Sequence, residues 1–539
     1  MLKIQQNILN NEQEMSFSKS IATFGGFTFI SRITGFLRDV VLANFLGAGL
    51  VSDAFFVSFK LPNLFRSLFG EGAFNSAFVP IISSKLNKSK KQAVEFSSNS
   101  LSLLTFILAI FIVIFELLMP YVVAVIAPGF AGDSEKMALA VILSRITFPF
   151  LLFVSIVSFQ SGVLNALGRF AAPAAAPVIL NLLMIASIFI FVPFAPSAAH
   201  GIAIGVTVAG FIEILWLNYF LRKENFFLRP RFDIFNIFKD KDIKTLLKRV
   251  GPGILGSGIY QINVTVSTII ASLIGTGAIS WLYYATRIQQ LPLGIVGAAI
   301  GVALLPILSK HINNDEEKEA FRMQDKAIEI GALLSIPSTV AMIVLAKAST
   351  NILFQHGRFG EFETEMTYRA IIALAFGLPF FTAVKALSQN MFARGDTKTP
   401  VKYGLVSFIA NVFFSLVLMK PFGHIGIAWA STISAIVSCW AFYFGLKKRG
   451  YWELSPALGM QVFKISLASI IMGIALFFAD LGLDVWLGGW LRLGLLIKLF
   501  IFGIMCILGL ATFIFSAKIL GVPNIDYILN LIKRGRKHV

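Results

Sequence analysis

The stretch SRITGFLRDVVLANFLGAGLVSDAFFVSFKLPNLFRSLFGEGAFNSAFVP, which runs from Ser31 to Pro80, decides the fold. It is mostly apolar and long enough to cross a bilayer twice, because one crossing takes about 20 helical residues. The short uncharged turn Gly47-Ala48-Gly49 divides it into two runs. Charged residues nevertheless recur in both runs. We therefore expect two spanning helices whose charged faces point away from lipid.

The whole chain has the composition of a polytopic membrane protein. Of its 539 residues, 57% are hydrophobic and 14% are charged, and the mean hydropathy is +0.80. Soluble domains are about 45–50% apolar and about 25% charged. The net charge of +18 comes from Lys and Arg residues clustered between apolar runs, as the positive-inside rule describes. The charge therefore reflects membrane topology, and no nucleic acid partner is expected.

Apolar runs of spanning length predict an all-α protein with about fourteen transmembrane helices. Loops rich in Lys and Arg alternate with loops that contain few or none, such as 46–52 and 195–199, which have neither. This alternation places both termini in the cytoplasm. The expected spans are residues 20–45, 53–84, 97–119, 138–163, 174–194, 200–221, 250–274, 279–309, 326–346, 368–390, 401–419, 424–446, 460–480 and 493–517.

A weak internal repeat appears at an offset of about 227 residues. The string FVPIIS, ending at Ser83, is echoed by LLPILS, ending at Ser309. One such match can arise by chance in an apolar sequence, but other short matches recur at nearly the same offset. They predict two six-helix pseudo-symmetric halves around a central cavity, followed by two C-terminal helices. The expected divisions are the N-terminal half 1–222, a basic cytoplasmic linker 223–249, the second half 250–449, and the last two helices with a basic tail 450–539.

Charged and polar residues fall on single faces of three of these predicted helices, at about 100° per residue. An ionisable residue at the centre of a spanning helix costs about 2.5–3.5 kcal/mol when it faces lipid. We therefore expect these faces to line the central cavity. The predicted cavity residues are Arg32, Arg38, Asp39, Asp53, Lys60, Asn63, Arg66, Glu71 and Arg287.

The cations of this set outnumber its carboxylates. An anionic ligand would explain the excess, because Arg presents a planar fork that fits phosphate or carboxylate and Lys adds a point charge. The alternative is an ion-pair lattice that holds the helices together, with Arg38 paired to Asp39 or Asp53 and Lys60 paired to Glu71. Both arrangements can occur within one transport cycle.

Other polar groups in the apolar runs carry weaker signals. Glu116 and Arg145 are expected to form a pair, whereas Glu213 and Lys385 are either ion sites or charges that reach the membrane surface. The two cysteines and five histidines show no metal-ligand spacing. No catalytic residues, metal or cofactor are therefore expected, and the chain is not predicted to be an enzyme.

The stretch from Ser31 to Pro80, in which LRD, DAFF, KLPNLFR and EGAF stand unbroken, closely resembles the start of the MurJ (MviN) lipid II flippase family. That family belongs to the multidrug/oligosaccharidyl-lipid/polysaccharide (MOP) exporter superfamily. The resemblance extends over essentially the whole chain, including the segment WLYYATR that ends at Arg287. Some members carry Asp immediately before this Arg, where the present chain has Thr286.

The resemblance implies a flippase of the bacterial cytoplasmic (inner) membrane. Its substrate would be lipid II, the undecaprenyl-pyrophosphate-linked disaccharide-pentapeptide, which moves from the cytoplasmic to the periplasmic leaflet. The predicted cavity residues would bind this substrate. Membrane lipids and cell-wall synthesis proteins are the other partners that the resemblance suggests.

The expected mechanism is alternating access, driven by the membrane potential or by a proton or sodium gradient. One alternative is a flippase for another lipid-linked oligosaccharide of the O-antigen type, which is chemically close. A second alternative is a drug or cation antiporter of the same superfamily. The basic excess of the predicted cavity disfavours the antiporter, because an acidic cavity would suit a cation.

Overall fold

The computed structural model describes residues 25–66, 73–231 and 233–522, with all side chains except those of residues 73, 76, 251–260, 262–264 and 295–303. Every regular element in this described part is a helix. The predicted all-α class is therefore confirmed.

Nine described helices are long and apolar enough to cross a membrane. Helices α15 (Glu361–Ala375) and α16 (Leu378–Ala393), which meet at a bend of 41°, form a tenth candidate span. These ten coincide with ten of the predicted spans, so the polytopic membrane fold is confirmed. The other four predicted spans, 20–45, 53–84, 250–274 and 279–309, each include residues or side chains outside the described set. The count of fourteen therefore stays a prediction.

The helices form two compact units, which meet in the sequence between Thr276 and Gly277. The first unit begins with a helix over residues 25–46, here called the N-terminal helix. It continues with α2 (Leu50–Arg66), α3 (Ala73–Lys88), α4 (Lys90–Leu117), α5 (Met119–Ile126), η2 (Pro128–Gly132), α6 (Ser134–Thr147), α7 (Phe150–Ala166), α8 (Ala171–Ile190), η3 (Val192–Phe194), α9 (Ala198–Lys223), α10 (Ile234–Lys239) and α11 (Lys241–Ser272).

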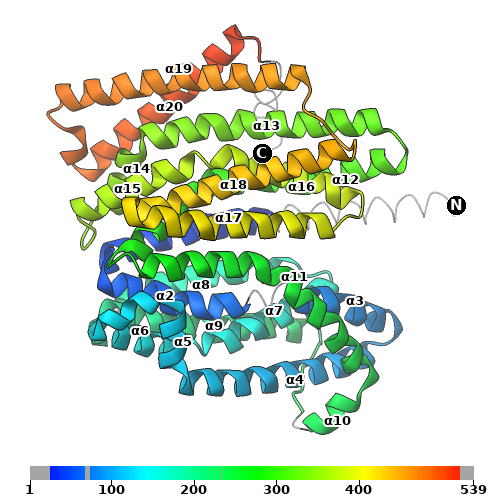
Figure 1. Cartoon of the computed structure of the whole chain (residues 1–539). Coiled ribbons are helices and arrows are strands. Elements are labelled where there is room, and N and C mark those ends of the chain that lie inside the picture. Colours follow the sequence, from blue (N-terminus) through cyan, green and yellow to red (C-terminus); the bar gives the residue numbers. More distant parts are fainter. Residues whose placement is uncertain (1–24, 67–72, 232, 523–539) are drawn as a thin grey trace. The chain divides into compact units, whose positions relative to one another are not determined.

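The second unit begins with α12 (Figure 1). Besides α15 and α16 it contains α12 (Ala278–Asn313), α13 (Glu317–Val344), α14 (Ala346–Phe354), α17 (Lys398–Phe422), α18 (His424–Lys448), α19 (Pro456–Trp486), η4 (Trp490–Arg492) and α20 (Leu495–Ile519). The domain boundaries predicted from the repeat stay a prediction, because compact packing does not identify homologous halves.

Aromatic rings fill the core of the first unit. The ring of Phe78 from α3 lies 4.8 Å from that of Phe159 on α7 and 5.6 Å from that of Phe96 on α4, measured between centroids. All three side chains are buried. Helix α11 also packs against α3 and α4 in this unit. At the other end of α11, a Cβ on Gly129 would lie 1.9 Å from the Ser272 carbonyl oxygen, so only glycine fits there.

Pro62 interrupts the backbone hydrogen bonds of α2. It has no N–H to donate to the carbonyl of Ser58, one turn earlier. The Thr147 hydroxyl, at the end of α6, donates to this carbonyl at 3.0 Å instead. Because hydrocarbon contains no water that could satisfy the group, this contact allows a proline within a spanning helix.

The basic linker is docked on α4. The backbone N–H of Arg229 donates to Ser98 Oγ at 3.1 Å, and that of Arg231 donates to Ser102 Oγ at 2.7 Å. The Arg231 side chain also pairs with Glu95 at 3.1 Å. A buried run of serines on α4 thus provides the surface on which the linker lies.

In the second unit, the last two helices pack against α13. Helices α19 and α20 lie beside each other (Figure 1), and their buried residues form one cluster with Leu333 and Ile352. Asp325 on α13 fixes the segment before α19, because its carboxylate accepts from Trp452 Nε1 and from Ser455 Oγ, each at 2.7 Å.

The turn between α16 and α17 is held by Asp396. Its carboxylate accepts from the backbone N–H groups of Lys398 and Thr399, at 3.1 and 2.9 Å, and from Thr399 Oγ1 at 2.6 Å. It also pairs with Arg449 at 2.6 Å. The Thr399 hydrogen bonds, followed by the Arg449 guanidinium, hold the pKa of Asp396 well below its usual range.

We expect this turn to lose stability in acid. Because the folded-state pKa is lowered, the stabilisation is fully present above the unfolded-state pKa of about 3.9 and is lost as the pH falls toward the folded value. Replacing Asp396 by Asn keeps an acceptor for the N–H groups but removes the charge. Wild type should therefore unfold about 1–2 °C above Asp396→Asn at pH 7, and the difference should shrink below about pH 4. Thermal unfolding in detergent measures it, and a difference that is constant down to pH 3 would contradict the assignment.

Candidate functional site

A tight turn at residues 47–49 joins the N-terminal helix to α2. Gly47 has φ of 66°, in the left-handed region that favours glycine. The Gly49 N–H donates to Ser52 Oγ at 2.7 Å, and the Asp53 N–H donates to the Gly49 carbonyl at 2.9 Å. This turn fixes where the charged residues of the two helices lie in the first unit.

Arg38 is buried and bonded on several sides. Its Nε and Nη2 donate to Asp39 Oδ1 at 3.0 and 2.7 Å, and its Nη1 donates to Asn181 Oδ1 at 2.9 Å. The guanidinium carbon lies 5.8 Å from the centroid of the Phe59 ring. Only 6% of Arg38 and 1% of Asp39 are exposed. The predicted Arg38–Asp39 pair is therefore present, but it lies within the N-terminal helix and does not hold two helices together; substrate binding by either residue stays a prediction.

Asn181, on α8, ties the N-terminal helix to the rest of the unit. Besides accepting from Arg38, it donates through Nδ2 to the Ser31 carbonyl at 3.1 Å and to Thr34 Oγ1 at 3.3 Å. A Cβ on Gly35 would lie 3.2 Å from this Nδ2, so a small residue is needed there. The sequence analysis missed Asn181, for which an amide in an apolar run was the only available signal.

Asp53 is paired with a lysine that the sequence analysis also missed. Its Oδ2 accepts from Lys136 Nζ at 2.8 Å, and the two side chains are 0% and 4% exposed. The ammonium lies 4.4 Å from the Phe130 ring centroid and 3.5 Å from Thr276 Oγ1. Lys136 stands in the first turn of α6, next to a predicted loop, where a lysine is expected to be solvated. No sequence signal indicated its burial.

The remaining predicted residues of α2 lie on its second half. Lys60 Nζ donates to Thr268 Oγ1 of α11, and Asn63 Nδ2 donates to the Phe59 carbonyl at 2.7 Å. Arg66, the last residue of α2, is half-buried. Arg32 is exposed on the N-terminal helix. Glu71, and with it the predicted Lys60–Glu71 pair, lies outside the described residues.

Arg287 belongs to the second unit and is held by its own helix, α12. Its Nη2 donates to the Tyr283 hydroxyl at 2.8 Å and its Nη1 to Gln290 Oε1 at 3.3 Å. The guanidinium carbon is 4.6 Å from the Tyr283 ring centroid. Tyr283, Arg287 and Gln290 therefore lie together along one side of α12, while substrate binding by Arg287 stays a prediction.

The other charged residues of the apolar runs differ in their burial. Glu213 lies within α9 and is 3% exposed, so the expectation that it reaches the membrane surface is wrong. Lys385 is exposed on α16. Glu116 interacts electrostatically with Arg145, but in the described part of the chain its Oε1 is buried without a hydrogen-bond partner.

In the described part of the first unit, the Arg38–Asp39 pair is one in which an anion can take the place of the carboxylate. Carboxylate and phosphate oxygens both accept from the guanidinium fork, so an anion that reaches Arg38 competes directly with Asp39. Because the displaced Asp39 carboxylate is buried, the loss of its cation is costly and favours release of the anion. This arrangement suits transient binding of an anion.

The family model for lipid II flippase MurJ matches residues 42–496 of this chain. The chain belongs to the MurJ family of lipid II flippases. The resemblance that the N-terminal motifs indicated is therefore confirmed. A flippase is a transporter, so the family is one of transporters. A MurJ relative from Rickettsia prowazekii (strain Madrid E), named a probable lipid II flippase, is 37% identical over 499 residues, which cover 93% of this chain and 97% of its own.

Solved structures agree with this assignment. A lipid II flippase MurJ in an inward closed conformation matches with a TM-score of 0.77 and 25% identity, over 94% of this chain and 99% of its own. An inward-facing multidrug resistance MATE transporter of the MOP superfamily shares the fold, with a TM-score of 0.64 and 17% identity over 78% of this chain and 94% of its own.

We expect Lys136→Met to destabilise the first unit strongly. Removing the lysine takes the cation away from the buried Asp53 carboxylate, and breaking a buried pair in this way costs about 3–5 kcal/mol. Thermal unfolding of the purified protein measures the loss. The double variant Lys136→Met with Asp53→Leu removes both charges and should recover most of the stability. Equal losses in the single and double variants would mean that the pair is not the cause.

Asn181→Leu should also destabilise the protein, by about 1–3 kcal/mol, because Arg38 Nη1 then loses its oxygen acceptor, and Met184 Sδ at 3.8 Å is a weaker one. Asn411→Leu is the control, since Asn411 is a buried amide on α17 of the second unit. Limited proteolysis near the N-terminal helix should accelerate in Asn181→Leu alone. Equal cleavage of both variants would contradict the conclusion that Asn181 holds the N-terminal helix against α8.

Proposed function

We propose that this chain carries lipid II from the cytoplasmic to the periplasmic leaflet by alternating access, with its intramembrane cations receiving the pyrophosphate. The observation that carries the proposal is the MurJ family match over residues 42–496. The basic character of the predicted site supports it, because a lipid-linked pyrophosphate is anionic. The membrane is the bacterial cytoplasmic membrane, and both termini lie in the cytoplasm.

In the proposed cycle, the headgroup enters from the cytoplasmic side while the polyprenyl tail remains in lipid. The exposed Arg32 makes the first contact, because its charge is already accessible on the N-terminal helix. The pyrophosphate then competes with Asp39 for Arg38, and Arg66 of the same unit supplies a further cation. Closing the cytoplasmic side and opening the periplasmic side releases the headgroup as the Arg38–Asp39 pair forms again.

The membrane potential supplies direction in this proposal. Moving a negative charge outward across an inside-negative membrane is favourable by about 2.3 kcal/mol per charge per 100 mV. No bound cofactor is needed for such a step. A proton or sodium ion coupled to the cycle is the alternative energy source.

The decisive experiment is depletion of the protein in its own bacterium, with probing of the leaflet that holds lipid II. We expect lipid II to accumulate in the inner leaflet, and wild type to restore outer exposure. Arg32→Gln should restore it at least about tenfold more slowly, because one charge contact to the pyrophosphate is lost. Arg32 is exposed, so this variant removes a charge without opening a packed core.

Arg322→Gln is the matched control. Arg322 lies on α13, its side chain is 74% exposed, and its pair with Glu319 is long, at 3.6 Å. Its replacement therefore removes the same charge at a position outside the predicted site. Collapsing the potential with valinomycin and potassium should stop flipping even when the pH gradient is kept. If depletion leaves lipid II exposure unchanged and no second flippase is present, another lipid-linked oligosaccharide becomes the leading substrate.

A further inference from the structure

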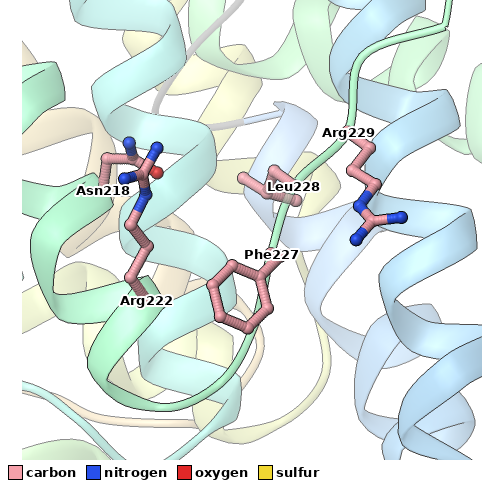
Figure 2. A pocket seen from close by; sticks show the side chains of 5 residues that line it. All are labelled: Asn218, Arg222, Phe227, Leu228 and Arg229. Atoms are coloured by element: carbon pink, nitrogen blue, oxygen red, sulfur yellow. The ribbon is translucent and has the colours of Figure 1, made fainter.

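The end of α9 and the start of the linker form a pocket of about 250 Å³ that none of the predicted transport residues lines. Its walls are Asn218 and Arg222 from α9 and Phe227, Leu228 and Arg229 from the linker. Figure 2 shows Arg222 beside Asn218, and Arg229 on the other side of Phe227 and Leu228. Two guanidinium groups thus flank an apolar floor.

The pocket arginines differ from the cations around them. Arg169 pairs with Glu224 at 2.7 Å, Arg231 pairs with Glu95 at 3.1 Å, and Lys90 Nζ donates to the Glu224 carbonyl at 2.8 Å. In the described part of the chain, the side chains of Arg222 and Arg229 form no such ion pair or hydrogen bond. The local carboxylates are therefore used by neighbours, and the two pocket charges remain available to an external anion.

The backbone that shapes the pocket is held in place. The chain reverses at Asn225, which has φ of 52°, and the Phe226 N–H donates to the Leu221 carbonyl at 2.9 Å. The Phe226 side chain is 0% exposed. The Arg229 N–H is bonded to Ser98 Oγ on α4. A ligand therefore needs to order side chains but not the backbone, which lowers the entropic cost of binding.

Aromatic residues on α9 place the pocket at the membrane–water interface. Trp216 and Tyr219 precede Arg222 by one to two turns and are 37% and 62% exposed. Trp and Tyr concentrate at the headgroup level of membranes. Phe227, on the pocket wall itself, is 49% exposed. This combination provides cations for a phosphate and apolar surface for the chain attached to it.

We propose that this pocket binds the headgroup of an anionic phospholipid from the leaflet that the linker faces. Arg222 and Arg229 contact the phosphate, the Asn218 amide donates to it or to the glycerol headgroup, and Phe227 packs against the upper acyl chain. A free phosphate ion would use the arginines but not the exposed ring. Basic pockets on the cytoplasmic side of transmembrane helices favour anionic lipids over zwitterionic ones.

The test uses the full-length protein in neutral detergent, titrated with phosphatidylglycerol or phosphatidylcholine and read by native mass spectrometry. We expect wild type to prefer phosphatidylglycerol, and Arg222→Gln with Arg229→Gln to weaken its binding by about 10- to 30-fold. Phosphatidylcholine binding should change little. Both arginines are exposed, so the variant should unfold at the wild-type temperature; if the double variant is not recovered folded, the two single variants replace it.

The matched control is Arg231→Gln with Lys239→Gln, which removes the same charge from exposed positions of the same linker. We expect this control to keep at least about a third of the wild-type affinity, because neither residue lines the pocket. An equal loss in both double variants would overturn the proposal in favour of diffuse attraction to the linker. Complete displacement of phosphatidylglycerol by millimolar inorganic phosphate, at constant ionic strength, would also overturn it and indicate a soluble anion site.

Discussion

The lack of water in hydrocarbon is the constraint on which this structure depends. Any polar group that enters the membrane must find its partner within the protein, since an unsatisfied group costs several kcal/mol. The first unit meets this requirement at three places. Asp39 and Asn181 satisfy Arg38, Lys136 neutralises Asp53, and Thr147 bonds the carbonyl that Pro62 leaves open. These contacts also join helices that are far apart in the sequence.

The same requirement gives the intramembrane charges two roles. A buried ion pair adds little net stability over an apolar pair of the same shape, but breaking it by removing one partner is costly. Such a pair is therefore a poor device for stability alone. It becomes useful when a ligand can replace one partner, because the guanidinium then stays compensated while the cost of the displaced carboxylate favours release of the ligand. Arg38 and Asp39 fit this description for an anionic ligand, whereas Asp53 and Lys136, beside Phe130, fit a fixed connection between α2 and α6.

At the membrane surface, water can satisfy polar groups, so the cations of the linker do not all need a partner within the protein. Arg231 of the linker pairs with Glu95, Glu224 of the linker pairs with Arg169, and the linker backbone is bonded to serines of α4. Arg222 and Arg229 remain available because water can solvate them at a low cost. A guanidinium group that would need a partner inside the membrane can thus remain available to a ligand at the membrane surface. The basic linker that the topology rule explains can therefore also recognise lipids.

The sequence by itself determined the all-helical membrane class, ten of the spans and the family. Length, hydropathy and helical periodicity are local properties, so they can be read without knowing what lies opposite. Only the tertiary structure decided the partners. Asp53 meets Lys136 and Arg38 meets Asn181, residues that are 83 and 143 positions apart. A lysine beside a loop and an amide in an apolar run have no pattern that marks them as partners, because only the packing of α6 and α8 in the first unit brings them to those charges.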